Sequence, residues 1–175
     1  MNGNKQLQKI VLAASLAAVS VVIDVFFKYA LGIQNFGLPF YAVPIIMGSI
    51  ILGPVYGVIM AFVGDGVGVI LANQGYLPMF VLAPMVWGFL PGLFLHKKYS
   101  KVKLAYIIPV TYLLASLSNT LALYIHFDMQ TTLALLVLRM GLIPFNSVII
   151  YMVTKDVFQK LLPFSERFIL NPQKT

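Results

Sequence analysis

The sequence has no cysteine, few charged residues and only two histidines. Without cysteine there is no disulfide framework, no thiolate metal site and no cysteine nucleophile. Two histidines and five acidic residues leave little material for a hydrolytic site, and neither His96 nor His126 has partners at metal-ligand spacing. The nucleotide-binding motif G-x-x-x-x-G-K-[ST] is also missing. We therefore expect no enzyme activity, no metal and no bound cofactor in this chain.

Charge is scarce, whereas apolar residues are abundant. Charged residues make up 10% of the 175 positions and hydrophobic residues 60%, with a mean hydropathy of +0.92. A soluble domain carries about 25% charged residues, so this chain has too little polar surface for water. The composition predicts an all-α integral membrane protein that forms one domain over residues 1–175, a length that suits about six spans.

Six apolar segments follow one another along the chain. The first is much longer than the roughly 7 to 15 apolar residues of a signal peptide, so it is read as a retained helix. The predicted spans are 7–31, 38–52, 54–72, 81–95, 104–125 and 132–157. Pro39, Pro44, Pro78 and Pro84 fall at or near the starts of spans, where a missing N–H costs little.

The basic residues predict the orientation, because short loops rich in Lys and Arg stay cytoplasmic. Six spans with the N-terminus inside place both termini in the cytoplasm and only Lys28 and Arg139 toward the outside. The net charge of +7 is then mostly a matter of topology beside anionic lipid, and no aromatic interleaving points to nucleic acid. The predicted cytoplasmic basic residues are Lys5, Lys9, Lys97, Lys98, Lys101, Lys103, Lys155, Lys160, Arg167 and Lys174.

Polar and aromatic residues inside the spans are the most informative feature, because such groups are costly in lipid and mark functional sites. Asp24, Asp65, Asn119, Arg139 and Trp87 each lie six or seven residues inward from the predicted external end of a span. At 1.5 Å per residue they share a depth of roughly 10 Å. This arrangement is typical of a ligand pocket that is open to the outside.

Each of these residues also has a purely structural interpretation. Asp65 and Arg139 could neutralise each other, and Asp24 could pair with Lys28 one helical turn away. Asn119 could link helices by a hydrogen bond. Trp87 could be buried packing. The residues alone leave these alternatives open.

Small residues form two further patterns. Ala13, Ala14, Ala17 and Ala18 give two overlapping Ala-xxx-Ala pairs in the first predicted helix, which would let another helix approach closely, from a partner or within the bundle. Gly57, Ala61, Gly64 and Gly68 form a smooth stripe beside Asp65 in the third. We interpret this second stripe as internal packing that leaves room for a ligand.

The stretch from Leu38 to Leu95 resembles the substrate-binding S-components of energy-coupling factor (ECF) vitamin transporters, and it is most similar to their folate-specific branch. The resemblance rests on the leucine-proline start, GPVYG at the third span, Asp65 later in it and GYLP before the fourth. The segments NTLAL from Asn119 and LRMGLIPFNSVIIY from Leu138 are similar too. With the alanine pattern, it covers about 80% of the chain.

The resemblance implies a multi-pass protein of a prokaryotic plasma membrane that captures a vitamin from outside. It also implies a partner, an energising module made of a transmembrane coupling subunit and two ATP-hydrolysing subunits. In such proteins the alanine face of the first helix contacts the coupling subunit, and here this face corresponds to Ala13, Ala14, Ala17 and Ala18.

The residue chemistry suits folate, which has a donor-rich pterin edge, flat rings and an anionic tail. Asp65 could accept pterin donors, Asn119 offers both a donor and an acceptor, and Arg139 could bind a carboxylate through two hydrogen bonds. Trp87, Tyr76 or Phe80 could stack on the rings. The predicted site also includes Asp24 and the loop residues Asn73 and Gln74, because the Gly- and Pro-containing loops 34–39 and 73–80 are candidate lids.

Other readings remain open at this stage. Riboflavin, thiamine or a pyridine vitamin also carries flat rings with polar edges. A small channel or exporter gated by Asp65 and Arg139 belongs to a different class. So does a membrane-embedded enzyme that uses Asp24 and Asp65 as acid and base, although no intramembrane histidine supports it.

Overall fold

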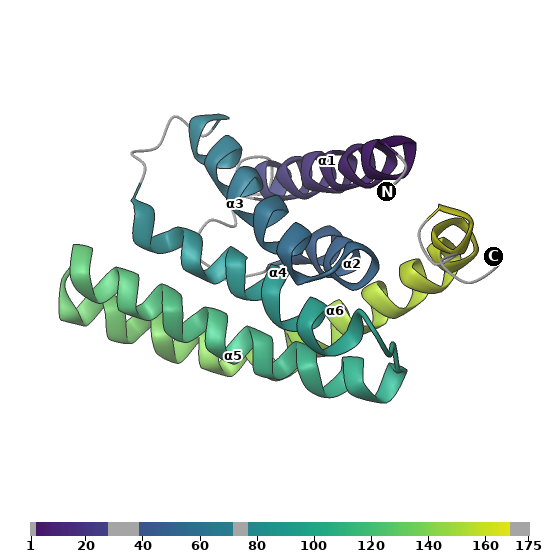
Figure 1. The fold of residues 1–175 in the computed structure, drawn as a ribbon. Helices are drawn as coiled ribbons and strands as arrows, with labels where there is room; N and C mark the ends of the chain where they lie inside the picture. The colour runs from purple at the N-terminus through teal and green to yellow at the C-terminus, as the bar shows by residue number, and fades with distance from the viewer. Residues whose placement is uncertain (1–2, 28–38, 72–76, 169–175) are drawn as a thin grey trace.

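The computed structural model describes residues 3–27, 39–71 and 77–168, with the side chains of 162 and 164–168 left out. Every regular element in these ranges is a helix, as the composition predicts. The helices are α1 (Gly3–Val25), α2 (Ala42–Leu52), α3 (Pro54–Leu71), the short 3₁₀ helix η2 (Pro78–Val81), α4 (Leu82–Leu95), α5 (Lys101–His126) and α6 (Met129–Phe168) (Figure 1).

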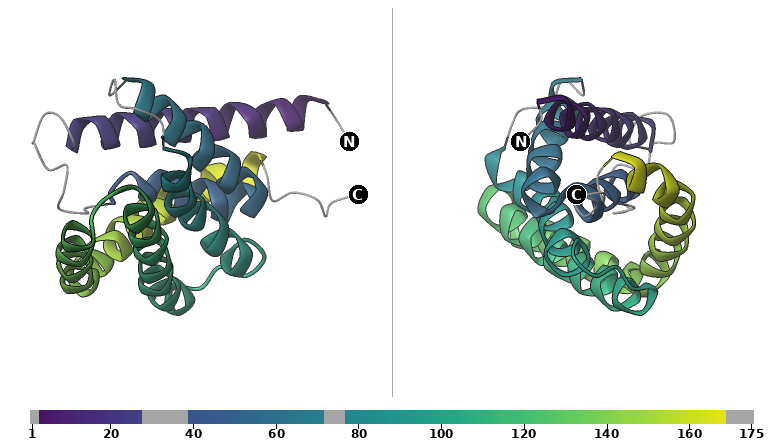
Figure 2. Two further views of the ribbon diagram at one scale, coloured as in Figure 1. Left: turned by 90° about the vertical axis from the view of Figure 1, so that its left-hand side faces the viewer. Right: turned by 45° about the vertical axis from the view of Figure 1, so that its right-hand side comes forward.

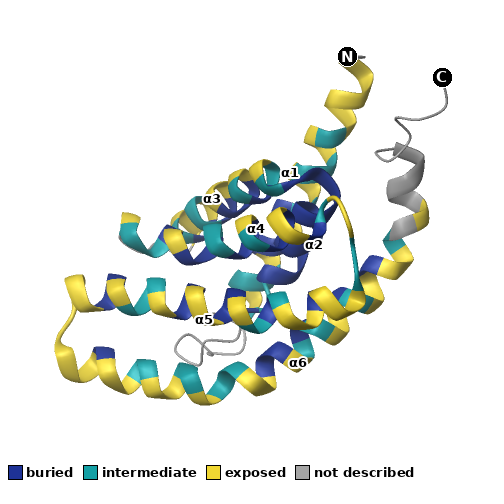
Figure 3. Cartoon of the chain, turned by 60° about the horizontal axis from the view of Figure 1, so that its bottom comes forward, coloured by how far each residue is buried: buried dark blue, intermediate teal, exposed yellow. Residues whose placement is uncertain are grey.

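Helix α2 lies at the centre of the molecule. It packs against α1, α3, α4 and α6, and all eleven of its residues are buried. The right-hand view of Figure 2 shows the other helices arranged around it, and Figure 3 shows its continuous burial. The hydrophobic core therefore consists of α2 and the inward faces of its neighbours.

Helix α2 is shorter than the predicted span 38–52, since a turn precedes it. In this turn the Ala42 N–H donates to the Pro39 carbonyl at 3.0 Å, and the Val43 N–H donates to the Phe40 carbonyl at 3.1 Å. Eleven residues rise only about 17 Å, so α2 is too short to cross roughly 30 Å of hydrocarbon as a helix. Five other helical segments are long and apolar enough to cross a membrane.

Close backbone contact holds α3 against α4. A Cβ atom on Gly57 would meet the Gly88 carbonyl oxygen, and one on Gly88 would meet the Gly57 carbonyl oxygen. The same stripe of α3 turns toward α1 at Gly64, where an added Cβ would lie 3.8 Å from Val21. The stripe thus serves internal packing, as its sequence pattern indicates.

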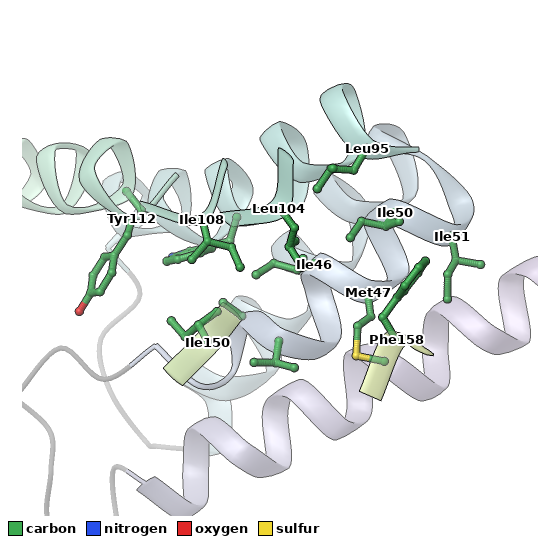
Figure 4. Packing of buried hydrophobic residues seen from close by; sticks show 14 of the residues in the cluster. Ile46, Met47, Ile50, Ile51, Leu95, Leu104, Ile108, Tyr112, Ile150 and Phe158 are labelled. Atoms are coloured by element: carbon green, nitrogen blue, oxygen red, sulfur yellow. The ribbon is translucent and has the colours of Figure 1, made fainter. Parts of the chain in front are cut away.

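Helices α5 and α6 form a long antiparallel hairpin joined at Phe127 and Asp128. The outer part of this hairpin is mostly exposed, whereas the later part of α6 reaches the core (Figure 3). The start of α1 and the end of α6 lie at the same end of the molecule (Figures 1 and 2). The later part of α6 contributes Ile150 and Phe158 to the core that contains Ile46 and Met47 (Figure 4).

Candidate functional site

Tyr41 is the residue around which the predicted polar groups gather. It lies in the turn before α2, and its hydroxyl is under the electrostatic influence of Asp24, Asp65, Tyr112 and Arg139. These four residues come from α1, α3, α5 and α6. The structure therefore brings together three of the residues that the sequence singled out, from helices distant along the chain.

The turn that carries Tyr41 is fixed to α1. The Ser20 hydroxyl donates a hydrogen bond of 2.7 Å to the Tyr41 carbonyl oxygen, and Ser20 is 3% exposed. Because the carbonyl acceptors and N–H donors of a turn must be satisfied in a bundle core, this bond sets the position of the turn. It links the first helix directly to the site.

The two carboxylates lie on facing helices. Asp24 and Asp65 are both half-buried, and the Asp24 Oδ2 atom would lie 3.5 Å from a Cβ on Gly68. Gly68 follows Asp65 by three residues, close to one turn of α3. The smooth stripe of α3 thus admits the Asp24 carboxylate near the turn that bears Asp65.

Arg139 forms the cationic part of the cluster. Its side chain is half-buried on α6, and its electrostatic neighbours are Tyr41 and Tyr112. Its Nη1 atom is buried and has no hydrogen-bond partner among the described residues. A buried guanidinium N–H without an acceptor is costly, so this nitrogen is well suited to receive a carboxylate or carbonyl oxygen from a ligand.

An aromatic pair lies beside these groups. Trp87 of α4 is 1% exposed, and its ring centroid is 5.6 Å from that of Tyr112 with an interplanar angle of 49°. Asn146 of α6 donates a hydrogen bond of 2.9 Å to the Tyr112 hydroxyl. Trp87 is thus both buried packing and part of the surroundings of the polar cluster.

The remaining predicted site residues lie farther away or outside the described residues. Asn119 is half-buried on the same side of α5 as Tyr112, about 10 Å along the helix. Phe80 of η2 has its ring centroid 6.2 Å from the ring of His126. Outside the described residues lie Asn73, Gln74 and Tyr76, and also Lys28, the possible partner of Asp24.

The four alanines of α1 divide between two faces. Ala17 is buried and Ala13 packs against the core, whereas Ala14 and Ala18 are exposed. The exposed pair has neighbours that are also exposed, among them Val11 and Val22. One smooth edge of α1 therefore faces out of the bundle.

Sequence reasoning missed Tyr41, Tyr112 and Asn146. Tyrosine is ordinary in apolar segments, so neither tyrosine carried a signal of its own. Asn146 did carry one, because an intramembrane amide is costly and it follows Arg139 by seven residues. This spacing places both residues on one helix face.

The comparisons with known proteins agree with the fold. Residues 8–162 match the family model described as ECF transporter, substrate-specific component. No curated protein and no solved structure is significantly similar to the chain. The family match spans nearly all of the described helices, and its members are substrate-binding transport subunits of multi-pass membrane complexes. The chain therefore belongs to the substrate-specific components of ECF transporters.

Proposed function

We propose that this chain binds a vitamin, with folate as the best candidate, and delivers it through an ATP-driven energising module. The observation that carries the proposal is that two carboxylates and a guanidinium act electrostatically on the same residue, Tyr41. Two carboxylates approach from α1 and α3, and one guanidinium approaches from α6. Such a site suits a ligand with N–H donors at one end and a carboxylate at the other.

Folate has this distribution of groups. Its pterin edge would donate to Asp65, with Asp24 close by, and its glutamate tail would accept from the buried Arg139 Nη1 atom. Its flat rings would lie against the aromatic pair of Trp87 and Tyr112. Aromatic contacts of this kind add roughly 0.5 to 1.5 kcal/mol beyond area burial.

The outer part of the site would be completed by residues near the predicted external end. Asn119 lies on the inward side of α5, and Phe80 packs near His126. Asn73, Gln74 and Tyr76 belong to the adjoining connection between α3 and η2. We assign these residues to ligand contact or to a lid.

The partner of the chain is an ECF energising module, which we propose to contain a coupling subunit and two ATPase subunits. The exposed pair Ala14 and Ala18 is the assigned contact for the coupling subunit, because small side chains allow close helix approach in lipid. Ala13 and Ala17 would support this face from within. The protein would lie in a prokaryotic plasma membrane, spanning it six times with both termini in the cytoplasm. Because α2 alone is too short to cross, the turn before it would complete the second of these crossings.

Thiamine is the second candidate ligand. Two carboxylates near Tyr41 outnumber the single guanidinium, and an excess of negative charge favours a cationic ring. Riboflavin and the pyridine vitamins lack both the cationic ring of thiamine and the glutamate tail of folate, so they match the charged residues of the site less well. A channel, an exporter or a membrane enzyme would not retain one tightly bound small molecule.

The deciding experiment is mass spectrometry of the small molecules extracted from protein purified from vitamin-replete cells. Isothermal titration of the emptied protein with folate, thiamine and riboflavin then ranks the candidates. We expect one bound molecule of folate per chain. Recovery of thiamine alone would transfer the assignment to the cationic vitamin, and absence of any stoichiometric ligand would contradict vitamin binding.

A further inference from the structure

Helix α6 has two weak points close together near its middle. Gly141 lies within the helix, and a Cβ added there would meet nothing within 4 Å. Packing therefore gives no reason for glycine, which weakens a helix relative to alanine. Pro144 follows three residues later and cannot donate to the carbonyl of Met140.

Functional groups lie on both sides of this point. Arg139, whose Nη1 atom is buried without a hydrogen-bond partner in the described part of the chain, comes two residues before Gly141. After Pro144, the segment 145–161, which we call the C-terminal arm, packs on the core. Its Ile150 and Phe158 lie beside residues of α2 (Figure 4), and the Phe158 ring centroid is 4.3 Å from that of Tyr99.

The inward face of the C-terminal arm carries two buried hydroxyls. Ser147 is 5% exposed and Thr154 is 0% exposed, and neither hydroxyl has a hydrogen-bond partner among residues 3–27, 39–71 and 77–168. A buried hydroxyl in this state destabilises the arrangement that contains it.

Five other helical hydroxyls avoid this cost by bonding to the carbonyl four residues earlier, whereas the buried Ser49 hydroxyl of α2 has no partner among the described residues either. Such bonds have donor–acceptor distances of 2.7 to 2.9 Å and are made by Ser15, Thr111, Ser118, Thr120 and Thr132. This bond is the usual local solution for Ser and Thr in helices. Its absence at Ser147 and Thr154 points to partners that these hydroxyls gain in a different position of the arm.

We propose that α6 is a hinged helix whose C-terminal arm pivots at Gly141–Pro144 against α2 between two positions. The second position gives Ser147 and Thr154 hydrogen-bond partners, and it is favoured when Arg139 binds the carboxylate of a ligand. The link to the ligand rests on the proposed function, whereas the hinge rests on α6 alone. Ligand binding at Arg139 thereby changes the surface at the end of the molecule where α1 begins.

The absence of cysteine allows a direct test with paired spin labels in lipid nanodiscs. Lys98→Cys and Gln159→Cys place labels on exposed positions of the α4–α5 connection and the C-terminal arm. Tyr124→Cys and Leu133→Cys label exposed positions of the outer hairpin as a reference pair. We expect two distances for the first pair, with folate raising the share of one, and a single unchanged distance for the reference pair.

Variants locate the hinge. Gly141→Ala should lower the population of the second position about fivefold, the factor that corresponds to the helix preference of alanine over glycine. Gly66→Ala is the matched control, since an added Cβ there also meets nothing within 4 Å. Ser147→Ala and Thr154→Val should deplete the same population. Thr111→Val should not, because the Thr111 hydroxyl already bonds to the Ile107 carbonyl at 2.7 Å.

The outcomes separate the hinge from the ligand assignment. One distance for the labelled arm, unaltered by Gly141→Ala and by the hydroxyl variants, overturns the hinge. Folate binding measured by titration without any change in the two populations overturns the link to Arg139. Two distances that respond to Gly141→Ala in a protein that does not bind folate support the hinge and remove folate from the proposed function.

Discussion

At the scale of single residues, Arg139 provides the sharpest test of the ligand. If its guanidinium holds a carboxylate tail, Arg139→Ala should weaken folate binding by about 1.5 to 3 kcal/mol, the usual scale for hydrogen bonds to charged groups. An analogue without the glutamate tail should lose much less. Isothermal titration with both ligands measures the difference, and equal losses would remove the carboxylate assignment.

Replacing Asp65 should weaken the binding of both folate and the tail-free analogue, because the two ligands share the ring edge that Asp65 would bind. Asp65→Asn replaces two acceptor oxygens by one acceptor and one donor group, so titration should show weaker binding of folate and of the tail-free analogue alike. Thermal stability distinguishes this role from a structural ion pair. If Asp65 and Arg139 only neutralise each other, each single variant should unfold at lower temperature and the double variant should recover.

Asp128 lies outside the membrane-spanning helices, and its hydrogen bonds predict that the stability of the protein depends on pH. Hydrogen bonds from the Thr131 backbone N–H and the Thr131 hydroxyl, both at 2.8 Å, lower the pKa of this carboxyl. The folded state therefore favours the ionised form. The stabilisation is present above the unfolded pKa of about 3.9 and is lost as the pH falls through the lower folded value.

This contribution is measurable as a difference between variants. The melting temperature of the wild type should fall more steeply below pH 4 than that of Asp128→Asn, which cannot titrate. The effect should be small because Asp128 is fully exposed. Parallel melting curves for the two proteins across this range would contradict the prediction.

The sequence predicted the charged members of the site because charge is costly in lipid at any position. Asp24, Asp65 and Arg139 were therefore identifiable without a structure. Tyr41 was not, since its importance comes from the turn that Ser20 holds against α1. A contact between residues 21 positions apart leaves no periodic trace in one sequence.

At the scale of the elements, the positions of the helices follow the apolar segments closely. The predicted span 54–72 and the helix Pro54–Leu71 agree almost to the residue. What the sequence did not reveal is that α2 is buried on every side. Lipid-facing and bundle-facing side chains are both apolar, so composition alone does not distinguish a peripheral helix from a central one.

The contact between α3 and α4 gives an element-scale prediction. Gly57→Ala and Gly88→Ala should each destabilise the protein by about 1 to 3 kcal/mol, the usual cost of overpacking, because the added Cβ would meet backbone atoms of the other helix. Gly66→Ala should be neutral or stabilising, since space is open there. Thermal unfolding in detergent compares the three variants, and equal melting temperatures would show that the helices can separate without cost.

At the scale of the whole molecule, the topology is testable by labelling. The basic residues and the common end shared by the start of α1 and the end of α6 (Figure 1) lead us to expect both termini inside. Single cysteines at Asn2 and Gln173 should resist an impermeant external thiol reagent in intact cells, whereas one at Asn73 should react. Labelling of either terminus would contradict six crossings with the N-terminus inside.

The last prediction concerns docking on the energising module, and it uses the division of the alanines in α1. Ala14→Trp or Ala18→Trp places a bulky side chain on the exposed edge, so close helix approach should be lost. Uptake and co-purification with the module should then fail, while vitamin binding to the isolated protein should be unchanged. Ala17→Trp is the contrasting variant, because Ala17 is only 8% exposed and overpacking there should lower the melting temperature and disturb binding. If Ala14→Trp and Ala18→Trp also destabilise the isolated protein, the edge serves packing within the chain; if they leave uptake intact, the module docks elsewhere.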